Sequence, residues 1–198
     1  MNEKFWDLKK SRQDSMINGA LKVFAQNGFR HASTDEIVAE ASVSKGLLFH
    51  YFYSKAGLYE FLAEYCARFA LVELHSELRR RETLPFFELQ RCVTDAEAQS
   101  MQRYPYIMLF LDCLRADRTA GEEITSSLEL YDGRLKELIS ASTLPETMSQ
   151  QEAGKIVRLL DLIRTDTASS LLSGGSFVPE QYAMAVEEYI QFFEQRYC

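Results

Sequence analysis

The sequence lacks the features of a membrane protein and of a metalloprotein. No stretch approaches the roughly 18 consecutive apolar residues that a membrane-spanning helix needs. The first residues, Met1 to Arg12, are charged and lack the apolar core of a signal peptide, so we expect a cytoplasmic protein. The cysteines form no CxxC pair, so no metal site is expected, and all but the last are interpreted as small hydrophobic residues on helix faces. They are Cys66, Cys92, Cys113 and Cys198.

Proline is scarce, and each proline stands between segments of helical periodicity. Proline is tolerated only in the first turn of a helix, so the four positions mark helix boundaries. They are Pro85, Pro105, Pro145 and Pro179. No segment alternates polar and apolar residues as a half-buried strand does. With 46% hydrophobic residues the chain is able to bury a sizeable core. We therefore predict an all-α fold of about nine helices.

Motifs of enzymes are missing as well. No nucleophile stands beside a base, no glycine-rich loop would hold a phosphate, and no pair of carboxylates suggests acid–base chemistry. Gly174-Gly175 is interpreted as a helix stop, and His75 alone makes no metal site. The sequence predicts neither enzymatic activity nor a cofactor.

The charge is distributed unevenly. The whole chain carries a net −7, which by itself disfavours a nucleic-acid partner. Residues 1–58, however, hold eight Lys or Arg against six Asp or Glu, a net of +2, and the remainder holds 14 against 23, a net of −9. A slightly basic N-terminal part on an acidic body is compatible with local DNA binding.

Apolar periodicity and end signals locate the helices. The first is expected from about Lys9 to Asn27, with Asn27-Gly28 closing it. Its buried face should hold Ile17, Ala20, Leu21 and Phe24. The other helices are expected at about 34–41, 45–52, 55–81, 85–103, 105–116, 121–141, 149–173 and 179–196.

The last two of these helices carry apolar residues on more than one side. In the segment 156–172, one stripe is Ile156, Leu160, Ile163 and Leu171, and a second is Val157, Leu162, Ala168 and Leu172. In the last helix, Tyr182, Val186, Tyr189, Ile190, Phe193 and Tyr197 share a face, with Ala185 and Phe192 beside it. A helix that is apolar on two sides needs two packing partners. We favour a homodimer seam; a central position in the body of one chain is the alternative.

The segment from Gly28 to Lys55 has the pattern of a helix-turn-helix. Ser33 with Glu36 forms a capping box pattern, and Ser44 is the next N-cap. Ile37, Val38 and Ala41 give the first short helix a buried face, and Val43, Leu48 and Phe52 do so for the second. Two short helices joined by the tight turn Ala41-Ser42-Val43 place the second helix in the major groove of DNA.

Polar and small residues remain outward on this unit. Lys45 is expected to donate to guanine O6 and N7, and Gly46 lets the backbone approach DNA. Hydroxyl, imidazole and ammonium groups are suitable donors to phosphate, and the candidates are Ser33, Thr34, His50, Tyr51 and Lys55. Both Lys45 and Lys55 are expected to point to solvent. The full set of expected DNA-binding residues is Ser33, Thr34, Ser44, Lys45, Gly46, Leu47, Phe49, His50, Tyr51 and Lys55.

Here the chain resembles the TetR family of transcription regulators. The resemblance rests on Phe24-Ala25-Gln26-Asn27-Gly28-Phe29, on Ile37-Val38, on Val43-Ser44-Lys45-Gly46, and on the run from Phe49 to Lys55. It implies an all-helical homodimer with a DNA-binding domain at 1–54 and an effector-binding and dimerisation domain at 55–198. It also implies a repressor that binds a palindromic operator and is released by a small molecule.

Three positions depart from the family pattern. Ser42 stands where the family usually has glycine, Leu47 where it often has Thr or Ser, and Phe49 where it usually has Tyr. Ser42 should hold the turn at a modest conformational cost. Leu47 could pack on a thymine methyl, and Phe49 loses a phenolic donor. These departures affect the operator sequence that is preferred.

The acidic body contains aromatic residues that could line an effector pocket, although an ordinary core role is at least as compatible with each. The candidates are Phe86, Phe87, Tyr104, Tyr106, Phe110 and Tyr131. Phe61 and Phe69 are further aromatic residues of the body that could line such a pocket. Other readings stay open at this point: a ligand-independent or activating regulator, a helical small-molecule-binding protein with a non-functional N-terminal domain, or an adaptor that acts through protein contacts.

Overall fold

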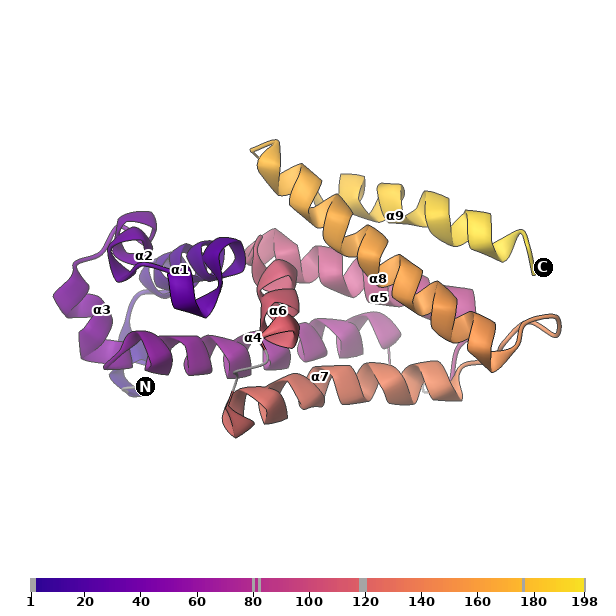
Figure 1. Cartoon of the computed structure of the whole chain (residues 1–198), viewed down its shortest axis with the longest axis horizontal. Helices are drawn as coiled ribbons and strands as arrows, with labels where there is room; N and C mark the ends of the chain where they lie inside the picture. The colour runs from indigo at the N-terminus through magenta and orange to yellow at the C-terminus, as the bar shows by residue number, and fades with distance from the viewer. Residues whose placement is uncertain (1–2, 80, 82, 118–120, 176, 198) are drawn as a thin grey trace. The chain divides into compact units, whose positions relative to one another are not determined.

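A computed structural model describes residues 3–79, 81, 83–117, 121–175 and 177–197. Within these residues the chain forms nine α-helices, one short 3-10 helix and no strand, which confirms the predicted all-α class. The elements are η1 (Glu3–Asp7), α1 (Lys10–His31), α2 (Thr34–Glu40), α3 (Lys45–Phe52), α4 (Lys55–Leu78), α5 (Phe86–Arg103), α6 (Ile107–Ala116), α7 (Glu122–Ala141), α8 (Gln150–Ser173) and α9 (Pro179–Glu194). Figure 1 shows them along the chain.

The predicted helix ends agree with the structure to within a few residues. The regular part of α1 ends where expected, because Gly28 takes a φ of 68° and a ψ of 172°, after which the helix continues briefly to His31. The four apolar residues expected on the buried face of α1 are fully buried. The segment η1 was not predicted. No helix in the part of the chain that the structure describes is long and apolar enough to cross a membrane.

The chain packs as two compact units. The first consists of residues 1–68 and 104–129, and the second of residues 69–103 and 130–198. Helix α4 therefore contributes to both units, and α6 belongs to the first unit although it follows α5 of the second. The expected functional division at residues 54 and 55 stays a prediction.

The first unit is built on contacts of α1. Helix α1 packs against α2 and against α6. The ring of Phe24 meets those of Tyr59 and Phe110, and the centroid distance from Phe24 to Tyr59 is 4.9 Å. Tyr104, just before α6, donates a hydrogen bond to Asp14 at 2.8 Å. Phe110 and Tyr104, two of the candidate effector residues, are thus core residues of this unit.

The second unit is held by α5, α8 and α9. Helix α9 packs on α5 and on α8, and Figure 1 shows α8 and α9 side by side. The remaining candidate effector residues of this unit, Phe86, Phe87 and Tyr131, are buried, whereas Tyr106 in the first unit keeps part of its surface exposed. The six candidates are therefore divided between two units, and five of them are packed in a core. An effector site formed by them stays a prediction.

A buried ionic cluster joins α5 to α8 in the second unit. Arg164 is 4% exposed, donates to the Gln90 carbonyl at 2.9 Å and to Thr94 Oγ1 at 3.2 Å, and lies 3.6 Å from the Glu97 carboxylate. Tyr182 of α9 donates to the same carboxylate at 2.7 Å. Because buried charges need such partners, this cluster fixes the relative register of the three helices. No sequence pattern singled out above indicates this cluster.

The apolar stripes expected on α8 and α9 divide differently from the prediction. The buried stripe of α8 is Ala153, Ile156, Leu160, Arg164 and Ala168. Ile163, Leu171, Val157 and Leu172 are half-buried, and Leu162 is 67% exposed. On α9 the buried residues are Tyr182, Val186 and Ile190, while Ala185, Phe193 and Tyr197 are half-buried and Tyr189 is exposed. The expectation that each stripe forms one face is therefore wrong, although both helices do carry apolar residues on two sides.

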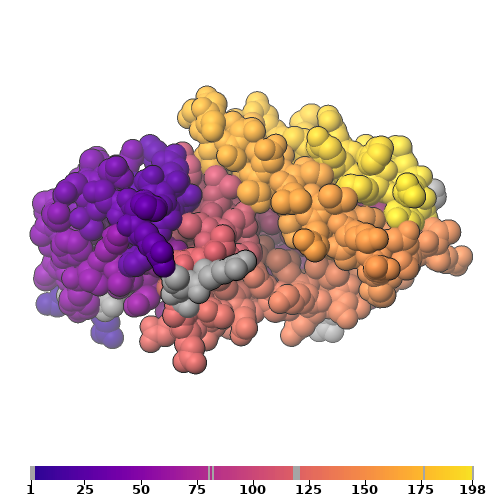
Figure 2. Space-filling view, in the orientation of Figure 1, coloured from indigo at the N-terminus to yellow at the C-terminus, as the bar shows by residue number. Residues whose placement is uncertain are grey.

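The second, outward apolar surface comprises Leu159, Leu162, Tyr189 and Phe192, and we call it the α8–α9 face. Leu159 and Phe192 line one groove between the two helices. Leu162 follows Leu159 by three residues and Tyr189 precedes Phe192 by three, so each pair shares a side of its helix. Figure 2 shows that the surfaces of α8 and α9 adjoin.

Candidate nucleic-acid interface

Helices α1 and α2 approach each other unusually closely at the end of α2. A Cβ atom added to Gly19 would lie 2.5 Å from the backbone nitrogen of Ala41, so only glycine fits there. Ser15 donates from its hydroxyl to the Ala41 carbonyl at 2.6 Å. The two contacts fix α2 against α1. The role of Gly19 was missed because its partner lies more than twenty positions away in the sequence.

Helix α2 begins as the sequence predicts. The Ser33 hydroxyl accepts a hydrogen bond from the backbone N–H of Asp35 at 3.2 Å. The carboxylate expected to complete the capping box, that of Glu36, instead accepts from the Asn27 side-chain amide at 3.4 Å. The N-cap is therefore confirmed, and the second half of the box is replaced by a contact with α1.

The turn between α2 and α3 contains a residue in the left-handed region. Ser42 has a φ of 52°, a conformation that glycine adopts at much lower cost. Its N–H donates to the Ala39 carbonyl, and the N–H of Val43 donates to the Val38 carbonyl, both at 3.1 Å. The turn therefore has the geometry that the family pattern provides with glycine, and serine holds it.

Helix α3 presents one buried side and one outward side. Its N-cap, Ser44, accepts from the backbone N–H of Leu47 at 3.2 Å, as predicted. Leu48 and Phe52 are fully buried. The predicted DNA-binding residues on the first turns differ in exposure. Ser44, Lys45, Gly46 and His50 are exposed, and Leu47 and Phe49, like Ser33 and Thr34 at the start of α2, are half-buried.

Tyr51 takes part in the packing of the first unit. It is 8% exposed, and its ring meets that of Phe5 edge-on at 5.8 Å. Phe5 belongs to η1, is itself fully buried and also touches Phe52 and Phe61. The Gln13 amide holds η1 in place by donating to the carbonyls of Trp6 and Leu8. The segment before α1 thus supports α3, and the sequence did not reveal this contact.

Lys55 does not point to solvent, so that expectation is wrong. Its ammonium donates to the carbonyl of Phe29 at 2.8 Å and to that of Ala32 at 3.0 Å. It also lies 4.7 Å from the centroid of the Phe29 ring. Carbonyl groups after a helix attract cations. In the free protein Lys55 therefore ties the start of α4 to the segment that leads into α2, and its contact with phosphate stays a prediction.

Lys45 is outward but is engaged by α2. Its ammonium lies 2.9 Å from the Asp35 carboxylate, with side-chain exposures of 50% and 76%. A second α2 carboxylate, Glu40, pairs with Lys22 of α1 at 2.7 Å, and that hydrogen bond raises the pKa of Lys22. Lys45 was predicted to be outward, whereas its ion pair with Asp35 was not predicted.

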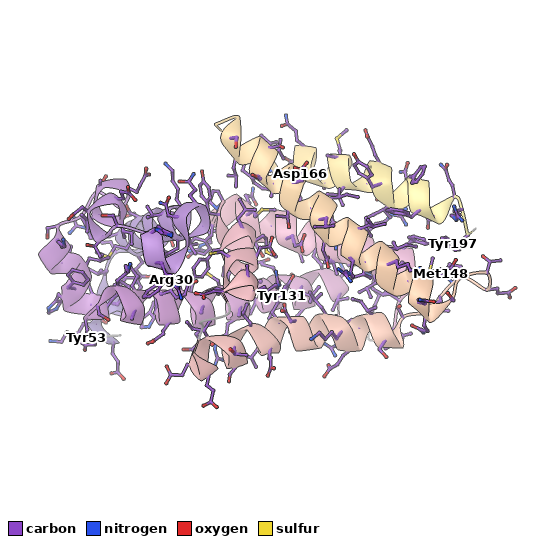
Figure 3. The ribbon with its side chains drawn as sticks, in the orientation of Figure 1. Arg30, Tyr53, Tyr131, Met148, Asp166 and Tyr197 are labelled. Atoms are coloured by element: carbon purple, nitrogen blue, oxygen red, sulfur yellow. The ribbon has the colours of Figure 1, made fainter. Side chains whose placement is uncertain are left out.

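One large aromatic residue lies open next to this surface. Tyr53 follows α3 with a φ of 63°, and its side chain is largely exposed. Figure 3 shows it at the edge of the first unit. Across the described ranges, no group of three or more His, Cys, Asp or Glu side chains is placed to hold a metal ion.

Known proteins resemble this arrangement. The family model described as "Bacterial regulatory proteins, tetR family" matches residues 16–62, which include α2, the turn and α3. The chain is 43% identical over 49 residues to an uncharacterized HTH-type transcriptional regulator, YuxN, of Bacillus subtilis (strain 168). That match covers 25% of this chain and 17% of the relative, so the two are comparable over less than a fifth of the relative's length. Residues 16–62 of this chain therefore match the TetR family pattern.

Solved structures extend the likeness of fold beyond the matched segment. A TetR family transcriptional regulator from Chloroflexus aurantiacus J-10-FL has a TM-score of 0.59 at 19% identity, over 98% of this chain and 97% of that one. A gamma-butyrolactone receptor described as ArpA-like has a TM-score of 0.53 at 19% identity, over 92% and 99%. The likeness in fold to these structures therefore extends over nearly the whole chain, well beyond residues 16–62.

Proposed function

We propose that this protein is a TetR-family regulator that binds operator DNA through α2, the turn and α3. The observation that carries the proposal is the outward side of α3, where Lys45, Gly46 and His50 are exposed on a helix whose other side is fixed by buried Leu48 and Phe52. A helix fixed on one side, with polar and small residues exposed on the other, suits insertion into the major groove. The base contact is assigned to Lys45, and phosphate contacts are assigned to Ser33, Thr34 and His50.

We further propose that the protein acts as a homodimer that joins through the α8–α9 face. Its members are exposed in a single chain, and a two-fold axis would bring this face against the same face of a second copy. Two recognition helices then read a palindromic operator whose half-sites lie about 34 Å apart or a multiple of it. A cluster of exposed apolar side chains on neighbouring helices is typical of a protein–protein interface.

The test of DNA binding compares two lysine variants. Operators are first selected from a random duplex pool, and binding is followed by fluorescence anisotropy. Lys45→Ala should cost about 1–3 kcal/mol per contacted base pair on the selected duplex and relax the preference at one position per half-site. Lys22→Ala is the matched control, because Lys22 is also paired with an α2 carboxylate but lies on α1.

Two outcomes contradict this assignment. A protein that selects no sequence and shows no salt-dependent affinity for duplex DNA is not an operator-binding regulator. If Lys22→Ala relaxes the sequence preference and Lys45→Ala does not, α3 is not the helix that reads the bases. Lys45 is exposed, so its replacement should leave the helical circular dichroism signal unchanged.

The regulatory sense proposed is repression relieved by a small molecule bound in the second unit. The support is that one protein of the same fold is a gamma-butyrolactone receptor. Helix α4 belongs to both units without interruption, so a shift at its second-unit end would be carried to the DNA-binding end. Release requires that the ligand prefer the state with mismatched half-site spacing. A panel of gamma-butyrolactones of increasing acyl length, titrated against the protein–duplex complex, tests this; no change in affinity with any member favours a different ligand class or a ligand-independent regulator.

A further inference from the structure

Each carboxylate of α2 forms an ion pair or accepts a hydrogen bond from a neighbouring side chain. Asp35 pairs with Lys45 of α3, Glu36 accepts from Asn27, and Glu40 pairs with Lys22. Only the first of these contacts involves α3. The residue assigned to base contact is thus held, in the free protein, by a carboxylate from the preceding helix.

The geometry of this pair makes it a competitor for DNA. Asp35 is in the first turn of α2 and Lys45 is the first residue of α3, and both side chains are exposed on the outward surface. The Asp35 carboxylate, 2.9 Å from the Lys45 ammonium, accepts a hydrogen bond from it as a phosphate oxygen or a guanine acceptor would. For Lys45 to contact DNA, the contact with Asp35 must be exchanged, and the Asp35 charge must then stay close to the phosphates.

We propose that Asp35 sets the DNA affinity of this protein by competing with DNA for Lys45. The inference rests on the proposed function and concerns a residue outside the DNA-contacting set. Because the DNA affinity is lower, an effector needs a smaller coupling free energy to release the protein from DNA.

The size of the effect follows from the exposure of the pair. Exposed ion pairs contribute about 0.2–1 kcal/mol, which corresponds to about 1.4- to 5-fold in affinity for each half-site. A dimer exchanges two such pairs, so Asp35→Asn should tighten binding by about 2- to 30-fold. The salt dependence of binding should also steepen by roughly one unit per half-site in Asp35→Asn. In this variant Lys45 is no longer neutralised by Asp35, so one more net positive charge is available to release a counterion from DNA.

The experiment is a double-mutant cycle in the full-length chain. Anisotropy titrations with a labelled random-sequence duplex of about 30 base pairs and with the selected operator compare the unaltered protein, Asp35→Asn, Lys45→Ala and the double variant over a range of salt concentrations. The gain from Asp35→Asn should appear with both duplexes. In the Lys45→Ala background it should shrink to no more than the gain given by the control Glu40→Gln, which removes an α2 carboxylate that pairs with Lys22.

Several results would overturn the inference. An equal gain in both backgrounds would mean that Asp35 acts by general repulsion and not through Lys45. Weaker binding with relaxed sequence preference in Asp35→Asn would mean that Asp35 orients Lys45 for base contact. An unchanged affinity and salt slope would remove any role in binding. If the unaltered protein binds no duplex at low salt, the proposed function itself fails, which is distinct from an unaltered protein that binds and an Asp35→Asn variant that behaves identically.

Discussion

Leu162 is the most exposed aliphatic side chain of the α8–α9 face, and its replacement by glutamate tests the proposed dimer directly. Complete burial of a leucine side chain contributes about 1.5–3 kcal/mol. Because Leu162 is 67% exposed in the single chain, its burial in a seam would contribute about 1–2 kcal/mol. Two-fold symmetry doubles this to about 2–4 kcal/mol, so loss of the side chain alone raises the dimer Kd by about 30- to 1,000-fold.

Glutamate adds to this loss, because a carboxylate enclosed in a seam loses its hydration. Leu162→Glu should therefore sediment as a monomer at micromolar concentration, where the unaltered protein sediments as a dimer, and should bind a palindromic operator far more weakly. Its thermal unfolding as a monomer should be unimpaired, since Leu162 makes few contacts within the chain. Val72→Glu is the matched control: Val72 is 63% exposed on α4, outside the α8–α9 face.

The reasoning would be refuted by a Leu162→Glu variant that sediments with the unaltered dimer. It would be refuted equally by an unaltered protein that is monomeric at micromolar concentration. If Val72→Glu breaks the dimer and Leu162→Glu does not, the seam lies on another surface of the molecule.

Two further predictions concern the ionic contacts of the second unit. Arg164→Met should lower the free energy of unfolding by about 3–5 kcal/mol in urea titrations, because it leaves the Glu97 carboxylate buried without its cation, and addition of Glu97→Gln should recover most of the loss; equal losses in the single and double variants would contradict this. Glu194→Gln should lower Tm at neutral pH, because the Arg91 hydrogen bond lowers the pKa of Glu194 and so stabilises the fold above the ordinary carboxyl pKa. The Tm difference should shrink as the pH falls below 4.5 and disappear once Glu194 is protonated in the fold, whereas a difference that persists in acid would exclude the ion pair as its cause.

The parts of the interface that were predicted depend on neighbours in the chain. Ser33 and Ser44 cap helices by bonding to N–H groups two or three residues ahead, and the turn at Ser42 is determined by its own dihedral angles. Apolar spacing on α3 likewise predicts that Leu48 and Phe52 are buried together. Such features are local, so the order of residues is sufficient to identify them.

The parts that were missed depend on which elements meet. Lys55 has the charge and position of a phosphate ligand, and only the arrival of the Phe29 and Ala32 carbonyls beside it gives it another partner. The same holds for Phe5, which supports α3 only because η1 packs its ring against that of Tyr51. A sequence shows that these side chains need partners but not which partners they obtain, because the partners are set by tertiary packing.

Arg164 shows that part of this information was nevertheless present in the sequence. The buried stripe of α8 passes through positions 156, 160, 164 and 168, at a constant spacing of four, and the third position is an arginine. If only apolar residues are considered, Arg164 is passed over and its neighbours are assigned to two stripes. The spacing of four alone predicts that Arg164 lies on the buried side of α8. A buried charge requires an opposite charge on the facing helix, and α5 offers Glu97 from a buried stripe that also holds Gln90 and Thr94. Once that stripe is set aside, Leu159 and Leu162 remain on another side of α8 with much of their surface exposed, and this exposure is the reason for proposing a second copy.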